Sequence, residues 1–428
     1  MDGTDSVAVA ADTGTGRKKV GRAVVIIALM YLRTLLVSWF FFKPVLRAFN
    51  GKPCLRERPY TLPSVPYWDL VKLKLLWIAR IWAPQTSQPV KSWLDARHLA
   101  VMRRIEAHVE KTGTLQQQEI PLPEFDWKNG TPEEFYERFV KTPMPVVLRG
   151  YALETDAVKK WSFDHIIEKC GDVQVNLTGP ESDWMGPLRE VRDPTIYCAN
   201  ADAPFKRVPQ LTTELAAHTL QPYLKRENTF NQIFIGQKAT GSGYHCAGIW
   251  NFFYMIEGEK KWTFVDPELT WMMYPSIHIG VLAFTSLVSF PDRSDTSVYP
   301  LYKYAPRYSV HLKPGDVLFN PPWWWHAIDN LTPTSVAVAT RWDAVRRDPS
   351  FYELNRMLSL LAVINPSFPG FLFDFLTIGD GQGGQSLLNE SAGALDENVT
   401  FAPKNQKARD KNVYHGKVVE KIRTKEKW

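Results

Sequence analysis

The residues best suited to chemistry are in the segment Gly243-Tyr244-His245-Cys246-Ala247, together with His326 about eighty positions later. Many Fe(II) sites that activate oxygen use two histidines and one carboxylate on a single face, which leaves the other positions for small molecules. The first histidine and the carboxylate usually stand as His-x-Asp or His-x-Glu. Ala247 occupies the carboxylate position here, and its methyl group cannot bind a metal. The spacing therefore predicts an iron site with two protein ligands and one vacant position.

Composition places these residues in an ordinary globular protein with basic ends. The chain has 428 residues, of which 45% are hydrophobic and 22% charged, and its net charge is +6. Basic residues gather in Arg17-Lys18-Lys19 and between Lys404 and Lys427. This distribution argues against a nucleic-acid-binding face on the core and favours contact with anionic membrane surfaces. The four cysteines show no C-x-x-C spacing, so they indicate neither a zinc motif nor a disulfide framework.

A membrane anchor is expected near the beginning of the chain. The segment from Ala23 to Phe42 has twenty residues with a single charge, Arg33, and is long enough to cross the hydrocarbon core as a helix. Its Leu, Ile, Val and Phe residues supply roughly −5 kcal/mol, against about +3 kcal/mol for a central arginine. The balance predicts a single-pass transmembrane helix, with a buried core helix as the alternative.

The orientation of this span depends on a second pattern, because basic residues flank it on both sides. The chain contains five N-glycosylation sequons, more than its composition predicts. They favour a catalytic domain in the lumen of the endoplasmic reticulum or Golgi. The sequons begin at Asn129, Asn176, Asn330, Asn389 and Asn398.

The chain divides into a main domain and several smaller segments. We expect a disordered basic tail, the transmembrane anchor, a helical connector, the main domain, a helical segment and a polar basic tail, over 1–22, 23–42, 43–119, 120–345, 346–378 and 379–428. In the connector, the apolar stretch Val65–Trp82 is expected either to lie on a membrane surface or to pack on the main domain. Ser92–Lys111 predicts an amphipathic helix. The segment 346–378 could pack beneath the main domain or form a homodimer contact.

The sequence of the main domain predicts a mainly β structure. It opens with Thr131-Pro132-Glu133-Glu134, a capping box that predicts a short helix, and continues with the strand Pro145–Gly150. Lys313-Pro314-Gly315-Asp316 predicts a tight turn before another strand, and Ser335–Ala339 a further strand. Repeated short strands between Gly and Pro turns are typical of a barrel or jelly roll.

Residues 131–342 resemble the cupin-like JmjC family of Fe(II)/2-oxoglutarate-dependent oxygenases. The resemblance implies a double-stranded β-helix (cupin or jelly-roll) fold with flanking helices, and Fe(II) and 2-oxoglutarate as cofactors. The matching pieces, in order, are Thr131–Gly150, Gly241–His245, Asn251-Phe252-Phe253, Gly258–Trp262 and Pro314–Asp316 followed by Pro321–His326.

The resemblance also implies roles for individual residues. His245 and His326 match the two metal-binding histidines. Lys260, fifteen residues after His245, matches the lysine that pairs with the distal carboxylate of 2-oxoglutarate. Asn251 and Ser242 match polar residues that contact the same cosubstrate. Further residues expected to line the site are Trp324 and Arg341.

Several functions remain open because of Ala247. Iron halogenases of the wider 2-oxoglutarate superfamily have Ala or Gly at this position, where a chloride restores the lost charge and is transferred to the substrate. A hydroxylase with water in the third position, a non-catalytic binding module, and a site completed by Asp329 or Glu257 are the alternatives. The anchor favours a lipid or another small molecule near the membrane as the substrate.

Overall fold

The computed structural model describes residues 58–61, 64–82, 88–112, 119–180, 183–238, 240–276, 283–288, 290–292 and 299–342. The expected tails 1–22 and 379–428, the span 23–42 and the segment 346–378 lie outside these ranges. Within them, no helix has the length and apolar character needed to cross a membrane.

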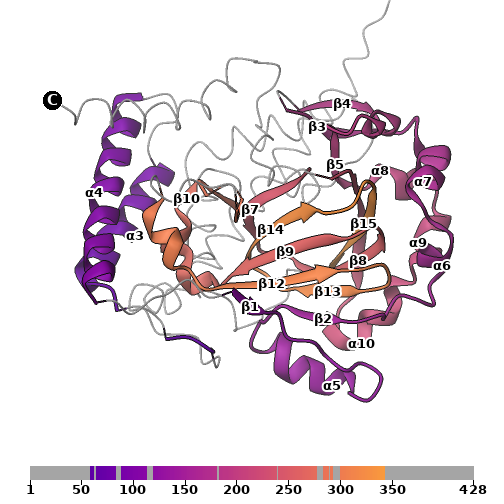
Figure 1. Cartoon of the computed structure of the whole chain (residues 1–428), viewed down its shortest axis with the longest axis horizontal. Helices are drawn as coiled ribbons and strands as arrows, with labels where there is room; N and C mark the ends of the chain where they lie inside the picture. The colour runs from indigo at the N-terminus through magenta and orange to yellow at the C-terminus, as the bar shows by residue number, and fades with distance from the viewer. Residues whose placement is uncertain are drawn as a thin grey trace, which may run out of the picture.

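Two β-sheets form the body of the protein (Figure 1). The seven-stranded sheet has the order β1 (Glu119–Pro121), β12 (Arg307–Leu312), β9 (Lys260–Val265), β14 (Trp325–Asn330), β7 (Gly241–Ala247), β11 (Ala283–Ser286), β10 (Pro275–Ser276). The eight-stranded sheet has the order β2 (Val146–Leu148), β13 (Val317–Asn320), β8 (Trp250–Glu257), β15 (Ser335–Trp342), β6 (Asn228–Gly236), β5 (Tyr197–Ala201), β3 (Gln174–Thr178), β4 (Asp183–Pro187). The predicted mainly β fold is confirmed, and its two sheets are consistent with a cupin or jelly roll.

Side chains alternate between two hydrophobic clusters along the strands, because neighbouring residues of a strand point to opposite faces. In β8, Phe253 and Met255 belong to the cluster that includes the space between the sheets. Phe252 and Tyr254 belong to the cluster beneath the short helices. The eight-stranded sheet is therefore buried on both faces at β8.

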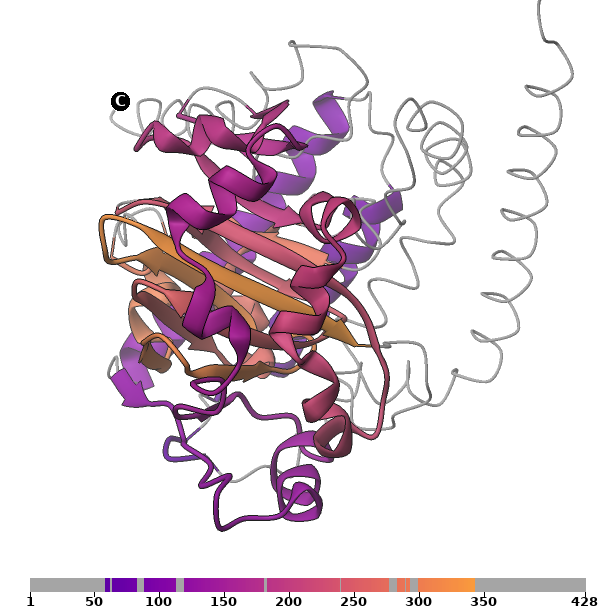
Figure 2. The same ribbon diagram turned by 90° about the vertical axis from the view of Figure 1, so that its right-hand side faces the viewer.

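Short helices cover the outer face of the eight-stranded sheet, on the side that Figure 2 turns toward the viewer. They are α5 (Pro132–Phe135), α6 (Asp156–Lys160), α7 (Phe163–Cys170), α8 (Ala203–Arg207), α9 (Gln210–Leu215) and α10 (Gln221–Leu224). Short 3-10 helices lie at Leu188–Arg192, Ala217–Leu220, Pro267–Met273 and Pro300–Tyr304, and the third of them has a kink at Leu269. The capping box is confirmed, since the Thr131 hydroxyl accepts the backbone N–H of Glu134 at 3.1 Å. The chain continues from α5 as a π-helical turn, Tyr136–Val140.

A helical hairpin of α3 (Tyr67–Trp82) and α4 (Gln88–Thr112) lies at the other end of the molecule (Figure 1). Leu73 and Trp77 of α3 are buried in the same cluster as Ile105 of α4. The predicted helix Ser92–Lys111 is confirmed within α4. The stretch Val65–Trp82 packs on the protein through one face, while Trp68 on another face is 69% exposed.

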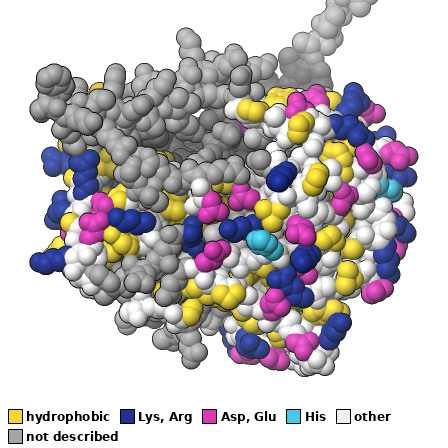
Figure 3. Space-filling view, in the orientation of Figure 1, with side chains coloured by type: hydrophobic (Ala, Val, Ile, Leu, Met, Phe, Trp, Pro, Cys, Tyr) yellow, Lys and Arg dark blue, Asp and Glu magenta, His cyan; other side chains and the backbone are white. Residues whose placement is uncertain are grey.

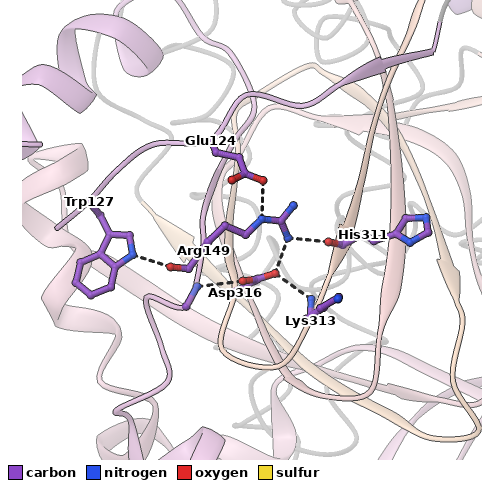
Figure 4. A network of polar contacts seen from close by, with 7 residues as sticks. Glu124, Trp127, Arg149, His311, Lys313 and Asp316 are labelled. Atoms are coloured by element: carbon purple, nitrogen blue, oxygen red, sulfur yellow. Dashed lines mark hydrogen bonds and ion pairs between the residues drawn. The ribbon is translucent and has the colours of Figure 1, made fainter. Parts of the chain in front are cut away.

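An ion-pair network joins β2 to the turn before β13 (Figure 4). The carboxylate of Asp316 accepts hydrogen bonds from Arg149 Nη1 at 2.6 Å and from the backbone N–H groups of Gly150 and Lys313 at 3.0 Å. Arg149 also pairs with Glu124 at 2.7 Å. Because Gly150 has a φ of 65°, only a residue without a β-carbon adopts this turn at little cost.

Charged side chains on the face shown in Figure 3 are interspersed by sign. Exposed pairs such as Lys159 with Glu154 and Arg192 with Asp164 are typical of the surface. Such pairs contribute little to stability.

Candidate functional site

The two predicted metal-binding histidines lie opposite each other on neighbouring strands. His245 of β7 and His326 of β14 are direct partners in the sheet, and their ring centroids are 4.2 Å apart. The Nδ1 of each lies 2.8 Å from a backbone carbonyl two residues earlier, that of Gly243 for His245 and that of Trp324 for His326. An Nδ1–H donated to a carbonyl fixes the tautomer and leaves the lone pair on Nε2. The structure thus brings together two imidazoles in the form that binds metals.

Burial keeps both rings neutral. It lowers the pKa of His245 to about 4. It also lowers the pKa of His326 well below its ordinary value, with a further lowering from the neighbouring His245. The charge of Arg341 acts in the same direction on both. Because a metal-binding histidine must be deprotonated, neither ring has to lose a proton near neutral pH.

The histidines line a pocket between the two sheets that encloses about 410 Å³, its mouth included. The predicted residues Ser242, Asn251 and Arg341 line it as well. No acid or cysteine is among the lining residues within the ranges that the structure describes. The full lining is Tyr197, Asn200, Phe234, Ser242, His245, Asn251, Phe253, Trp262, His326, Ile328 and Arg341.

A β-bulge explains why Ser242 and His245 face the same pocket although they are three residues apart. His326 pairs with His245, but Ile328, two residues later, pairs with Ser242. One extra residue of β7 therefore lies between the two pairs, which changes the face to which the earlier residues point. Regular alternation would have placed Ser242 on the opposite face.

Ala247 is not among the residues that line the pocket. Its side chain is buried, and its carbonyl accepts the backbone N–H of Trp323 at 2.6 Å. Trp323 has a φ of 69° and covers this end of β7: a Cβ added to Gly248 would lie 2.8 Å from its ring.

Neither of the two alternative carboxylates lines the pocket. Asp329 follows Ile328 directly in β14 and so points to the opposite face of the strand. Glu257 accepts hydrogen bonds from the backbone N–H of Phe163 and the hydroxyl of Thr334, both at 2.5 Å. These contacts hold Glu257 elsewhere, at the end of β8.

Lys260 lies behind the pocket rather than in its lining. Its ammonium donates to the side-chain oxygen of Asn330 and to the hydroxyl of Ser335, and it lies 5.6 Å from the ring centroid of Tyr197, which does line the pocket. Burial lowers the pKa of Lys260 to about 7. Because Asn330 is buried and engaged by Lys260, the sequon that it begins cannot accept a glycan in the folded protein.

Of the lining residues that the structure describes, Arg341 is the only cation, and two amides hold it. Its Nε donates to Gln232 Oε1 at 2.8 Å and its Nη2 to Asn200 Oδ1 at 2.9 Å, while Gln232 Nε2 donates to the Asn200 carbonyl at 2.9 Å. Burial lowers the pKa of Arg341 to about 10, so the guanidinium remains charged at neutral pH. Neither Asn200 nor Gln232 belongs to a motif, so no sequence pattern predicts their role.

Polar atoms in and around the pocket lack partners. Asn251 Oδ1 and Trp262 Nε1 are buried without a hydrogen bond. The Trp262 indole stacks on His326 with ring centroids 5.3 Å apart. The motifs did not point to Trp262 as a site residue, although strand alternation places it on the same face as Lys260. Buried polar atoms of this kind are normally paired, so they fit a polar ligand.

The residues fit Fe(II) through the two imidazoles alone. Asn320 Nδ2 lies 3.3 Å from His326 Nε2, and this contact would yield to a metal. In the part of the chain that the structure describes, no group of three or more His, Cys, Asp or Glu residues could hold a metal ion. Any further ligands would have to come from the cosubstrate or the solvent.

Comparisons with known proteins identify the type of domain that this chain contains. Residues 187–348 match the family described as the cupin-like domain. The chain is 26% identical to the arginine-specific demethylase JMJ22 of Arabidopsis thaliana over 230 residues, which are 46% of this chain and 42% of the relative. It is 26% identical to lysine-specific demethylase 8 of Xenopus tropicalis over 254 residues, 53% and 56% of the two chains. With the HSPB1-associated protein 1 homolog of Danio rerio it shares 29% identity over 118 residues, 26% of this chain and 25% of the relative. The chain thus spans between a quarter and about half of the length of these relatives. Together with the two-sheet fold, the matches show that this chain carries a cupin-like domain of the JmjC type.

Proposed function

We propose that this chain is an Fe(II)/2-oxoglutarate-dependent oxygenase-like enzyme whose metal site uses two protein ligands. The observation that carries the proposal is the pairing of His245 with His326, whose rings are 4.2 Å apart and whose Nδ1 atoms are both held by carbonyls. The similarity to JmjC-type relatives supports it. Two of those relatives are named for arginine or lysine demethylation, so a methylated side chain is one substrate class to test beside a lipid or small molecule.

The remaining lining residues suit an anionic cosubstrate. His245 and His326 would hold Fe(II), which together with 2-oxoglutarate supplies oxygen activation. Ser242 and Asn251 would orient the cosubstrate through hydrogen bonds. The aromatic walls of the pocket exclude water, which strengthens these polar contacts.

Anaerobic titration with Fe(II) and 2-oxoglutarate tests this function. The wild type is expected to develop the weak visible charge-transfer band of an iron–2-oxoglutarate complex. His245→Ala and His326→Ala should lose it, whereas His311→Ala, which removes an exposed histidine of β12, should retain it. A wild-type protein that neither develops the band nor retains iron in equilibrium dialysis contradicts the proposal.

A finer proposal is halogenation, which the alanine at position 247 suggests. Its support is that none of the pocket-lining residues described by the structure has an acidic side chain. We expect chloride to shift the charge-transfer band of the wild type. Ala247→Asp should abolish this shift and Ala247→Ser should not. An equal chloride response in all three proteins rejects halogenation but leaves oxygenation intact.

The second candidate is a non-catalytic binding module. It is favoured by the contact between Asn320 Nδ2 and His326 Nε2, which occupies the lone pair that a metal needs. This candidate predicts that Asn320→Ala raises metal affinity from an undetectable level. The oxygenase proposal predicts instead that the wild type already binds Fe(II).

We further propose that the domain is tethered to a membrane by the segment Ala23–Phe42 and faces the lumen of the endoplasmic reticulum or Golgi. Its support is the apolar run of twenty residues with one charge. Resistance of the full chain to carbonate extraction tests the tether. Release of the chain into the soluble fraction contradicts it.

A further inference from the structure

The pocket holds a buried positive charge that no acidic residue in the described part of the chain neutralises. Arg341 is 8% exposed, and the side-chain groups that contact it are the neutral amides of Gln232 and Asn200. Burial of an unpaired charge is costly, and buried cations are normally paired with an anion. Two of the five guanidinium N–H groups are used, so three remain available to a ligand.

The contacts of Arg341 form a built cradle rather than a chance arrangement. Gln232 is fully buried and also donates to the Asn200 carbonyl, so the two amides hold each other as well as the guanidinium. Asn200 has a φ of 56°, a conformation that asparagine adopts more readily than most residues. The cradle therefore fixes the direction of a side chain that is otherwise flexible.

A second donor lines the same pocket. Trp262 is 2% exposed, and its indole N–H has no acceptor. The indole stacks on His326, which places this donor beside the imidazole pair. Within the described residues, the Trp262 indole lacks an acceptor and the Arg341 guanidinium lacks a counter-ion. A small anion would satisfy both groups.

These charges also affect how favourably a metal ion binds to the two histidines. In a site with two histidines and a carboxylate, the acid offsets part of the metal charge. Here the imidazoles are neutral, no lining residue is acidic, and the one charged lining residue is a cation. A divalent ion and a guanidinium repel each other strongly in a buried site. An anion between them removes that repulsion.

We propose that Arg341 holds an anion beside the imidazole pair, and that metal binding at this pair depends on the anion. The second half rests on the proposed metal site, whereas the anion subsite itself does not. The anion is a carboxylate of the cosubstrate or a halide from solution. Because binding linkage is reciprocal, the metal tightens anion binding by the same factor.

The experiment uses the full chain in a nonionic detergent and a zwitterionic sulfonate buffer free of halide and carboxylate. Co(II) serves as a coloured, air-stable metal probe. Its affinity is measured by absorption with no added anion, with chloride, and with 2-oxoglutarate. We expect an increase of about tenfold or more with the anion that the subsite accepts, which is within the usual range of such linkage. The arm that responds identifies the source of the anion.

Arg341→Gln should bind Co(II) with an affinity that changes less than threefold with chloride and shows a reduced response to 2-oxoglutarate. Arg341→Lys should restore part of the response because it keeps the charge. Arg192→Gln, which removes an exposed cation on the surface, should behave as the wild type. An Arg341→Gln protein that is folded by circular dichroism and responds to both anions as the wild type does overturns the proposal.

Binding of anions to the metal-free protein separates this inference from the proposed function. Chloride is followed by the broadening of its NMR line, and 2-oxoglutarate by calorimetry. We expect binding by the wild type and Arg341→Lys and loss in Arg341→Gln. No metal binding under any condition, with anion binding intact, rejects the proposed function and the linkage but keeps the subsite. No anion binding by the metal-free wild type rejects the subsite.

Discussion

Lys260 donates its ammonium to the side-chain oxygen of Asn330, and both residues are buried behind the pocket wall. The pair joins β9 to β14 at their register partners. Burial lowers the pKa of Lys260, and no carboxylate in the described part of the chain offsets this effect. This arrangement makes the stability of the domain depend on the protonation of one lysine.

The free energy of unfolding should therefore rise with pH between about 7 and 10.5. Lys260 has a folded-state pKa of about 7 against an ordinary value of 10.5, so the unfolded chain binds more protons in this window. Stability then increases by up to about 1.4 kcal/mol per pH unit from this group. Urea unfolding of the wild type and Lys260→Met at pH 7, 8 and 9 measures the effect. The stability difference between them should move in favour of the wild type as pH rises, and a constant difference would show that Lys260 does not titrate there. Lys160→Met, at an exposed lysine, is the matched control.

Gly248→Ala should destabilise the domain through Trp323. The added Cβ would lie 2.8 Å from the Trp323 ring, which is closer than van der Waals contact allows. Forcing a methyl group into a packed site typically costs about 1–3 kcal/mol. In Trp323→Ala the same glycine substitution should cost less than half as much, because the clash is gone. Denaturant unfolding of the four proteins gives the coupling, and additive costs would contradict this explanation.

Asp316→Ala should destabilise more than Arg149→Met. Asp316 has a side chain that is only 7% exposed, and it accepts from Arg149 and from two backbone N–H groups, whereas the Arg149 side chain is 38% exposed. Loss of the acceptor leaves buried donors unpaired, for which we expect about 2–4 kcal/mol. Arg149→Met should cost about half of that, and Glu124→Ala, at an exposed partner, less than about 1 kcal/mol. Thermal unfolding of the three variants orders them, and equal costs would refute the distinction.

The proposed lumenal orientation predicts glycosylation at Asn129, whose side chain is exposed. Full-length protein expressed in animal cells should shift in mobility on endoglycosidase treatment, and Asn129→Gln should shift less. The peptide that contains Asn330 should be unmodified, because that side chain is buried and bonded. An unshifted wild type would place the domain outside the secretory lumen.

Much of the fold could be predicted because local patterns carry it. The capping box at Thr131 and the tight turn ending at Asp316 each act over a few residues, and both occur in the structure as expected. The pairing of His245 with His326 could also be predicted, because each histidine belongs to a separate motif of the sequence.

The rest of the site depends on contacts between segments far apart in the chain. Arg341 is separated from Asn200 by 141 residues, and no spacing rule connects them. Lys260 illustrates a second reason why the site could not be fully predicted. The sequence indicates the face of the strand to which Lys260 points, but it does not indicate that the side chain lies behind the pocket rather than in its lining. The position of Ala247 under Trp323 depends on the left-handed backbone of that tryptophan, which its residue type disfavours.

The bulge in β7 lets Ser242 and His245 share a cavity at a spacing that a regular strand would not allow. Deleting Gly243 would remove the extra residue and let the strand pair regularly with β14, which would leave Ser242 two residues before His245 and on the same face. The hydroxyl of Ser242 and both imidazoles would then keep their places. A protein so shortened would separate what the bulge contributes from what the serine and the histidines contribute, without replacing any of these side chains.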